Sequence, residues 1–96
     1  MFAIAFDLTV ADVQKHHPKG VSQAYRDIGA TLRPFGFDRV QGSVYLTANQ
    51  DMGNLFAAIS ALRELPWMSR CVRDVRGFKV ENWSDFTPNV MRVNRV

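Results

Sequence analysis

The sequence has little of what a disulfide, a metal centre or a membrane span requires. Its one cysteine, Cys71, excludes an intramolecular disulfide and lacks a closely spaced partner for a metal ion, so we expect a small, buried apolar side chain. The longest apolar runs fall far below the roughly 18 residues of a transmembrane helix. Met1–Leu8 has no basic segment ahead of it and carries a carboxylate, which indicates a strand rather than a signal peptide, and a cytoplasmic protein without membrane partners.

The signatures of several common enzyme sites are also missing. No Gly-rich phosphate loop or dinucleotide fingerprint occurs. Ser43 lies outside the Gly-x-Ser-x-Gly pattern of a nucleophilic serine, and Cys71 has no identifiable base near it. The sequence therefore gives no support to a nucleophilic triad or a dinucleotide enzyme.

Length and charge set the next bounds. A chain of 96 residues allows one domain, spanning 1–96, and oligomerisation is an easy way for it to bury more surface. The 12 basic against 9 acidic side chains are a mild excess that suits an anionic partner, although many small proteins are this basic for solubility alone. The basic residues crowd the last third of the chain: Arg63, Arg70, Arg73, Arg76, Lys79, Arg92 and Arg95.

The N-terminal segment alternates between two faces. Phe2, Ile4 and Phe6 share one face of the predicted strand, and two alanines with Asp7 share the other. Asp7 therefore lies near the carboxyl end of a central strand, where sites are often built in folds that mix helices and strands.

A hairpin is predicted over Gly36–Thr47, with its reversal at Gly42. Its polar residues suggest a site, because hydroxyls and an amide would line up beside a guanidinium, although a half-exposed, solvated sheet face would also explain them. On a period of two, one face takes Phe37, Arg39 and Gln41, and the next strand presents Ser43, Tyr45 and Thr47.

Two amphipathic helices flank the hairpin. The first has an apolar stripe at helical spacing and ends at Pro34 and Gly36. The second begins at Asn49 or Asp51 and ends at Pro66. The two stripes expected to be buried are Val21, Ala24, Tyr25, Ile28, Leu32 and Phe35, and then Met52, Leu55, Phe56, Ile59 and Leu62.

A last strand follows at Cys71–Glu81, with a bulge or an edge position expected near Gly77. The tail over 82–88 should pack back as a short helical turn, and residues 88–96 should fray. The order β-α-β-β-α-β predicts an α+β, ferredoxin-like fold, a four-stranded antiparallel sheet with two helices on one face. The uncovered face suits a ligand or a second copy.

Residues 9–20 read as a loop. Its His16-His17 pair invites a metal or proton-transfer role, and Lys15, His16, His17 or Lys19 could contact phosphate, but a surface loop is the default expectation.

A strand-end carboxylate, hairpin hydroxyls and a basic last strand suit phosphodiester chemistry. Arginines would hold phosphates, and Asp7 would act as a base or help to bind a divalent ion. Because each chain has one such carboxylate, a two-fold dimer would bring two together.

Several segments resemble the virulence-associated protein D (VapD) family over Met1–Thr87. They are Ala5-Phe6-Asp7-Leu8, Ala24-Tyr25-Arg26-Asp27, Gly36-Phe37, Gln41-Gly42-Ser43-Val44-Tyr45, Val72–Glu81 and Trp83-Ser84-Asp85-Phe86-Thr87. The family looks like a relative of the small dimeric nuclease of CRISPR spacer acquisition, whose Arg-Val-Gln-x-Ser-Val-aromatic hairpin is similar to Arg39–Tyr45.

The resemblance implies a homodimeric endoribonuclease that cleaves cellular RNA such as mRNA, and in some bacteria a virulence-associated toxin with a small antitoxin protein. Asp7 and Ser43 take the catalytic positions. The RNA-binding candidates are Arg39, Gln41, Tyr45, Arg73 and Arg76, with Asp74 as an alternative structural partner of the last two. No cofactor is required with certainty; Mg²⁺ at Asp7 is the one considered.

Two other functions compete with this one. The same fold could bind RNA or a protein without catalysis, since ferredoxin-like folds host many functions. Asp7 could also be structural, capping the next helix or pairing with an arginine, in which case its loss would lower thermal stability.

Overall fold

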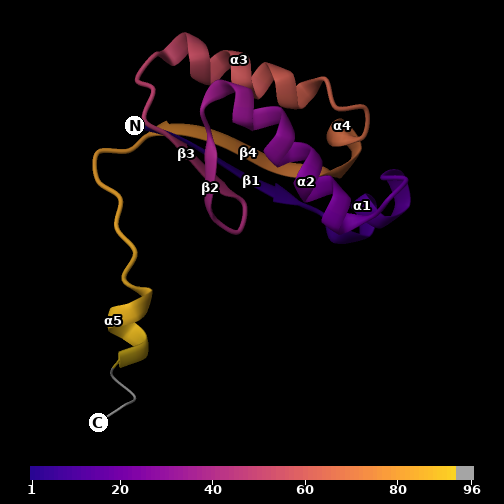
Figure 1. Cartoon of the computed structure of the whole chain (residues 1–96). Helices are drawn as coiled ribbons and strands as arrows, with labels where there is room; N and C mark the ends of the chain where they lie inside the picture. The colour runs from indigo at the N-terminus through magenta and orange to yellow at the C-terminus, as the bar shows by residue number, and fades with distance from the viewer. Residues whose placement is uncertain (93–96) are drawn as a thin grey trace.

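The alternating N-terminal residues form β1 (Phe2–Leu8), a central strand of a four-stranded sheet of order β2-β3-β1-β4. The structure, a computed structural model, describes residues 1–92 (Figure 1). The other strands are β2 (Asp38–Gln41), β3 (Val44–Thr47) and β4 (Val72–Lys79), and every neighbouring pair is antiparallel. The predicted hairpin and sheet are confirmed.

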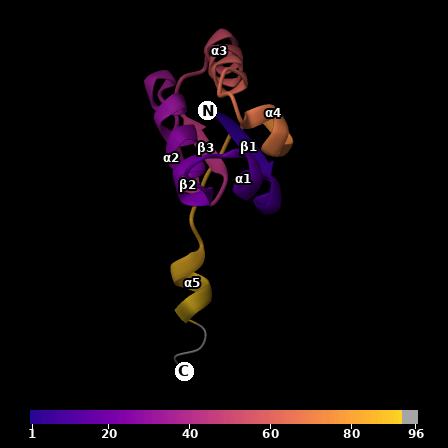
Figure 2. The same ribbon diagram turned by 90° about the vertical axis from the view of Figure 1, so that its right-hand side faces the viewer.

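Two long helices, α2 (Val21–Leu32) and α3 (Met52–Arg63), lie on one side of this sheet (Figures 1 and 2). A 3₁₀ turn, Arg33–Phe35, extends α2 towards β2. Two short helices, α1 (Val10–His16) and α4 (Met68–Cys71), contact each other at one end of the sheet. The order is the predicted ferredoxin-like one, with α1 and α4 added.

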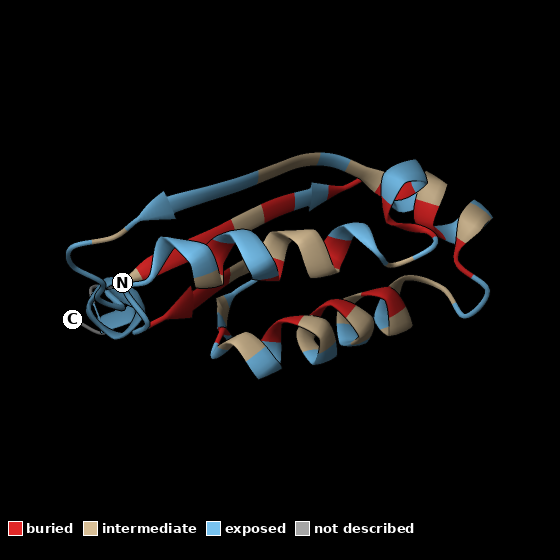
Figure 3. Ribbon diagram, turned by 90° about the horizontal axis from the view of Figure 1, so that it is seen from above, coloured by how far each residue is buried: buried red, intermediate tan, exposed pale blue. Residues whose placement is uncertain are grey.

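The core lies between the sheet and the two long helices. Alternate residues of β1 supply its sheet side, and Figure 3 shows this strand buried while β4 is exposed along much of its length. Each large apolar side chain buried here contributes about 1.5–3 kcal/mol. The buried residues from β1, α2 and α3 are Phe2, Ile4, Phe6, Leu8, Ala24, Ile28, Leu32, Leu55, Ala58 and Leu62.

Local signals place the ends of these elements. Asp51 caps α3, because its Oδ1 accepts a hydrogen bond of 2.8 Å from the backbone N–H of Gly53. Gly36 ends the 3₁₀ turn with φ at 82°, and an added Cβ there would lie 3.2 Å from Thr47 Oγ1. A side chain at Gly36 would therefore be strained as well as crowded.

Residues 10–16 form helix α1 rather than the predicted loop. One side chain of this helix, Val13, is buried, which is too few for an apolar stripe to show in the sequence. The predicted stripe of α3 was also partly wrong. Met52 and Phe56 are 63% and 73% exposed, because the core takes the helix face that carries Leu55 and Leu62.

The strand irregularity lies at Arg73 rather than near Gly77. Asp7 is opposite Asp74 while Leu8 is opposite Val72, so Arg73 is the extra residue of a bulge. Gly77 instead permits close approach of α3, since an added Cβ would lie 3.0 Å from Ile59 Cδ1. The predicted edge position is confirmed, because β4 is an outer strand.

The tail forms a helical turn at Thr87–Arg92 rather than over the predicted 82–88, and it does not pack back on the domain. Helix α5 (Thr87–Arg92) begins after Asp85, whose Oδ1 accepts a 2.8 Å hydrogen bond from Thr87 N–H, and it projects away from the sheet (Figure 1). Trp83 and Phe86 stay exposed. The rest of the tail for which fraying was predicted, 93–96, lies outside the described residues. Within residues 1–92, no helix has the length and apolar character to cross a membrane.

Candidate functional site

Asp7 lies at the carboxyl end of β1 on the sheet face opposite α2 and α3. The pleat requires this, because its neighbours Phe6 and Leu8 point into the core. The Asp7 side chain is 52% exposed, and its Oδ2 forms an ion pair with Arg73, whose Nη2 lies 3.0 Å away. Asp7 is thus an accessible carboxylate beside a guanidinium.

A second carboxylate, on the neighbouring strand β4, lies beside Asp7 on the same face of the sheet. Asp74 of β4 is its direct cross-strand partner, a position that would be repulsive for two uncompensated carboxylates. Arg76 Nε lies 3.0 and 3.1 Å from the two carboxylate oxygens of Asp74. Two carboxylate–guanidinium pairs therefore lie side by side, and we name the group of Asp7, Arg73, Asp74 and Arg76 the open-face cluster.

Asp7 pairs with an arginine, as the alternative of a purely structural role for Asp7 requires, but this ion pair contributes little to the stability of the fold. Both side chains are more than half exposed, and exposed pairs of this kind contribute about 0–1 kcal/mol. A carboxylate that stabilises the fold so little has no strong structural reason to be at the end of a central strand. The sequence offered Asp74 as a partner for either arginine; what it did not show was the register that places Asp74 opposite Asp7.

Ser43 lies on the other side of the sheet from Asp7. Its Oγ donates to the Tyr25 hydroxyl of α2 at 3.4 Å, and its carbonyl accepts from Phe6 N–H at 3.1 Å. Ser43 thus faces the helices, as Phe6 does. The structure does not bring the two predicted catalytic side chains together.

Arg39 and Tyr45 are cross-strand partners, so the guanidinium and the hydroxyl belong to neighbouring positions on one face of the sheet, as predicted. Both lie towards α2, where the Tyr45 hydroxyl is 3.3 Å from an added Cβ on Gly29. Arg39 Nε donates to the Gly42 carbonyl at 2.8 Å, which fixes the guanidinium at the hairpin. Burial raises the pKa of Tyr45, while the nearby positive charges of Arg39 and Arg33 act in the opposite direction.

The alternation predicted that Gln41 and Arg39 share one face of β2, but in the structure they lie on opposite faces. Arg39 pairs with Tyr45 and Gln41 with Val44, so a bulge between them places one extra residue on β2. Gln41 consequently moves to the face of Val44 and lines a hollow with Trp83 and Phe86. The predicted RNA-binding residues thus divide into Arg39 and Tyr45 beside α2, Gln41 near the tail, and Arg73 and Arg76 in the open-face cluster.

The His16-His17 segment has a structural role at His17. The ring is buried, its Nε2 lies 2.7 Å from Asp27 Oδ2, and its Nδ1 accepts from Lys19 N–H at 3.0 Å. Because that backbone group can only donate, Nε2 carries the proton and donates it to Asp27. The ring also packs edge-on against Trp67. His17 is therefore occupied in joining α1, α2 and α4.

Two other sequence expectations concern metal and thiol chemistry. Residues 1–92 contain no group of three His, Cys, Asp or Glu side chains that could hold a metal ion. Cys71 is buried, as expected, and burial raises the pKa of its thiol, which disfavours the reactive thiolate.

Comparisons with known proteins place the chain among its relatives. No protein-family model matches it. It is 62% identical over 87 residues to the endoribonuclease VapD homolog of Neisseria gonorrhoeae, covering 91% of this chain and 95% of the relative. It is 61% identical to endoribonuclease VapD of Haemophilus influenzae, again over 87 residues, which are 91% of this chain and 94% of that protein. The chain belongs to the VapD family. A further VapD, from Dichelobacter nodosus, is 47% identical over 91% of this chain and 94% of its own length.

The environment of Asp27 generates a stability prediction. Hydrogen bonds from Gln23 and then from His17 lower the pKa of Asp27. Since its folded pKa lies below the unfolded value of about 3.9, the stabilisation is complete above about pH 4 and is lost as the pH falls below it. We expect Asp27→Asn to lower the free energy of unfolding at pH 7 by about 1–3 kcal/mol, because a charged acceptor beside a buried ring is lost.

Urea unfolding of wild type and Asp27→Asn between pH 2.5 and 7 measures both effects. The difference between the two proteins should shrink as the pH falls below 4. Asp38→Asn, an exposed carboxylate of β2, is the control and should change stability by less than about 0.5 kcal/mol. Equal stability of wild type and Asp27→Asn at pH 7 would show that the His17 contact contributes nothing.

Proposed function

We propose that this chain is an endoribonuclease that cuts cellular RNA, with Asp7 as its catalytic residue. The observation that carries the assignment is an exposed carboxylate at the end of a central strand, paired with Arg73 and next to a second carboxylate–guanidinium pair. Its VapD relatives carry the name endoribonuclease, which agrees with this chemistry.

The open-face cluster has the parts that phosphodiester cleavage needs. Asp7 would take the proton of the attacking hydroxyl, either water or the ribose 2′-OH, as general base. Arg73 and Arg76 would stabilise the negative charge that develops on the phosphate oxygens. If the 2′-OH attacks, Asp7 takes its proton, a P–O2′ bond forms as the P–O5′ bond breaks, and the departing O5′ takes a proton from water, which leaves a 2′,3′-cyclic phosphate and a 5′-OH.

A Mg²⁺ ion would fit the number of carboxylates in the cluster. Mg²⁺ is usually held by one or two carboxylates together with substrate phosphates, and Asp7 and Asp74 face each other across β1 and β4. The ion would supply charge stabilisation at the phosphate. The arginines already neutralise both carboxylates, so the general-base route can also operate without a metal.

The functional unit that we propose is a homodimer formed through the uncovered sheet face. On this face Phe78 lies beside Ala3, which is followed across the sheet by Leu46, and the last two are already buried within one copy. Phe78 is 45% exposed, and Trp83 and Phe86 of the projecting tail are 43% and 68% exposed. A second copy would cover these groups and bring two Asp7 carboxylates into one composite site.

The physiological role and the protein partner rest on the family resemblance. We infer a role as the toxin of a toxin–antitoxin pair or as a virulence-associated factor, acting on RNA in the cytoplasm, with a small antitoxin protein as a further partner. A non-catalytic RNA-binding module is the second candidate function, since the arginines could hold RNA without Asp7 acting as a base.

Cleavage by Asp7→Asn tests the catalytic assignment. The change removes the proton acceptor and keeps the shape of the side chain, so cleavage of a structured RNA should fall by at least about 100-fold, the size of a general-base contribution. The melting temperature should move little, because an exposed ion pair is weak. Ser43→Ala should reduce cleavage far less, since Ser43 faces Tyr25 on the other side of the sheet.

All three proteins are purified identically, to control for contaminating ribonuclease, and assayed with Mg²⁺ and with EDTA. If wild-type protein cleaves RNA with Mg²⁺ but not with EDTA, the open-face cluster requires a metal ion. Equal cleavage by wild type and Asp7→Asn, or none by either, would contradict the nuclease assignment, and RNA binding retained by Asp7→Asn would then favour the binding module.

The dimer assignment is tested by two phenylalanines on opposite surfaces. Phe78→Asp puts a charge on the uncovered sheet face and should convert a dimer into a monomer, because the charge would be buried without a partner. Phe56→Asp, on the exposed side of α3, should remain dimeric. Light scattering after size-exclusion chromatography gives the mass of each, and a monomeric wild type or a dimeric Phe78→Asp would rule out this interface.

A further inference from the structure

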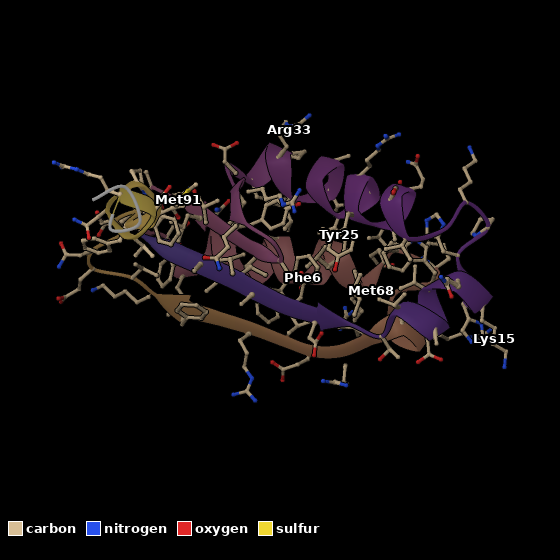
Figure 4. The ribbon with its side chains drawn as sticks, turned by 90° about the horizontal axis from the view of Figure 1, so that it is seen from below. Phe6, Lys15, Tyr25, Arg33, Met68 and Met91 are labelled. Atoms are coloured by element: carbon tan, nitrogen blue, oxygen red, sulfur yellow. The ribbon has the colours of Figure 1, made fainter. Side chains whose placement is uncertain are left out.

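A second cationic surface lies on the helix-covered side of the hairpin, away from the open-face cluster. It is a groove of about 690 Å³ between α2 and β2, which we name the α2–β2 groove. Three arginines line it: Arg26 from α2, Arg33 from the 3₁₀ turn, and Arg39 from β2. Figure 4 shows Arg33 at the far end of α2 and Tyr25 on the side of the helix that faces the sheet.

The three guanidinium groups are poorly compensated by protein charge. Among the ion pairs formed within residues 1–92, none includes Arg26, Arg33 or Arg39. One carboxylate, Asp38, also lines the groove, so the lining keeps a net charge of +2 from three arginines and one aspartate. By contrast, both arginines of the open-face cluster are paired with carboxylates. The groove is therefore the better of the two surfaces for an external anion.

The lining also indicates which part of an anionic polymer would bind. Both tyrosine rings at the groove pack against Phe6, with centroid distances of 5.9 Å for Tyr25 and 6.0 Å for Tyr45. The rings are used by the core, so the groove offers guanidinium and hydroxyl donors rather than an open aromatic platform. Such donors suit phosphate oxygens, and phosphate contacts carry no base sequence.

We propose that the α2–β2 groove binds backbone phosphates of an RNA strand and positions that strand for cleavage at the open-face cluster. This inference rests on the proposed endoribonuclease function. The groove borders β2, an outer strand separated from β1 by β3, which is roughly 10 Å across the sheet at ordinary strand spacing. An RNA strand that is bound in the groove and passes round the β2 edge of the sheet would reach Asp7 within a few nucleotides.

The test removes two groove charges and compares a matched pair elsewhere. Arg26→Gln/Arg33→Gln is compared with Arg63→Gln/Arg70→Gln, which removes two exposed charges from α3 and α4. Both doubles carry Asp7→Asn so that RNA is not consumed, and Arg26→Lys/Arg33→Lys in the same background keeps the charge. Fluorescence anisotropy with labelled single-stranded RNAs of two unrelated sequences gives the affinity over a salt series.

The groove double should lower the slope of log affinity against log salt by about 1.4, since each lost phosphate contact on a single strand is worth about 0.7. The loss should be the same for both RNA sequences. The lysine double and the α3–α4 double should keep the parent slope. In a protein that keeps Asp7, Arg26→Gln/Arg33→Gln should raise KM for RNA cleavage and leave kcat near the wild-type value, because the double substitution changes binding rather than chemistry.

Each contrary outcome has a distinct meaning. An unchanged slope in the groove double, with wild-type protein cleaving RNA, would overturn the groove assignment and leave the nuclease intact. An arginine-dependent slope in a protein that cleaves nothing would support the groove and refute the nuclease. Inorganic phosphate and a ribonucleoside monophosphate are added as competitors at matched ionic strength. If a low concentration of either one displaces the RNA, the groove binds a small anion, and its assignment as a site for an RNA strand is wrong.

Discussion

The pleat of β1 is the constraint on which the rest of the structure depends. With α2 and α3 covering one face of the sheet, alternate residues of β1 must be apolar and point inward, while those between them face outward. Phe6 and Asp7 are adjacent in sequence but point to opposite faces for this reason. A shift of register by one residue would bury the carboxylate, so the accessibility of Asp7 is enforced by the same burial that stabilises the domain.

This constraint separates the polar residues into two surfaces with different electrostatics. On the uncovered face, each carboxylate is balanced by a guanidinium, as suits a site where charge must be redistributed during a reaction. On the covered side, three arginines form no ion pair with any other described residue, and they suit the binding of phosphate. The hairpin connects the two, because its bulge directs Arg39 to one side and Gln41 to the other. Binding and chemistry are assigned to different sides of one thin sheet.

Much of the fold followed from periodicity, but contacts between distant residues did not. Alternation in β1, helical stripes and the hairpin glycine predicted the element order, because each depends on a local pattern. The sequence predicts a surface loop around His17, since its partner Asp27 is ten residues away in a helix and α1 has a single buried valine. The bulge at Arg73 and the face of Ser43 depend on strand register, which no local pattern specifies. Of the candidate site, the sequence identified Asp7, Arg73 and Arg76 but neither the register that places Asp74 opposite Asp7 nor the groove in which Arg26 and Arg33 lie.

The central claim is that two copies join through the uncovered face so that their Asp7 carboxylates act as one site. A heterodimer with one wild-type subunit and one Asp7→Asn subunit tests this most directly, after isolation through two different affinity tags. A composite site predicts that its rate of RNA cleavage falls close to that of the Asp7→Asn homodimer. A heterodimer that keeps about half of the wild-type rate would contradict the account, because each Asp7 would then act independently of the other.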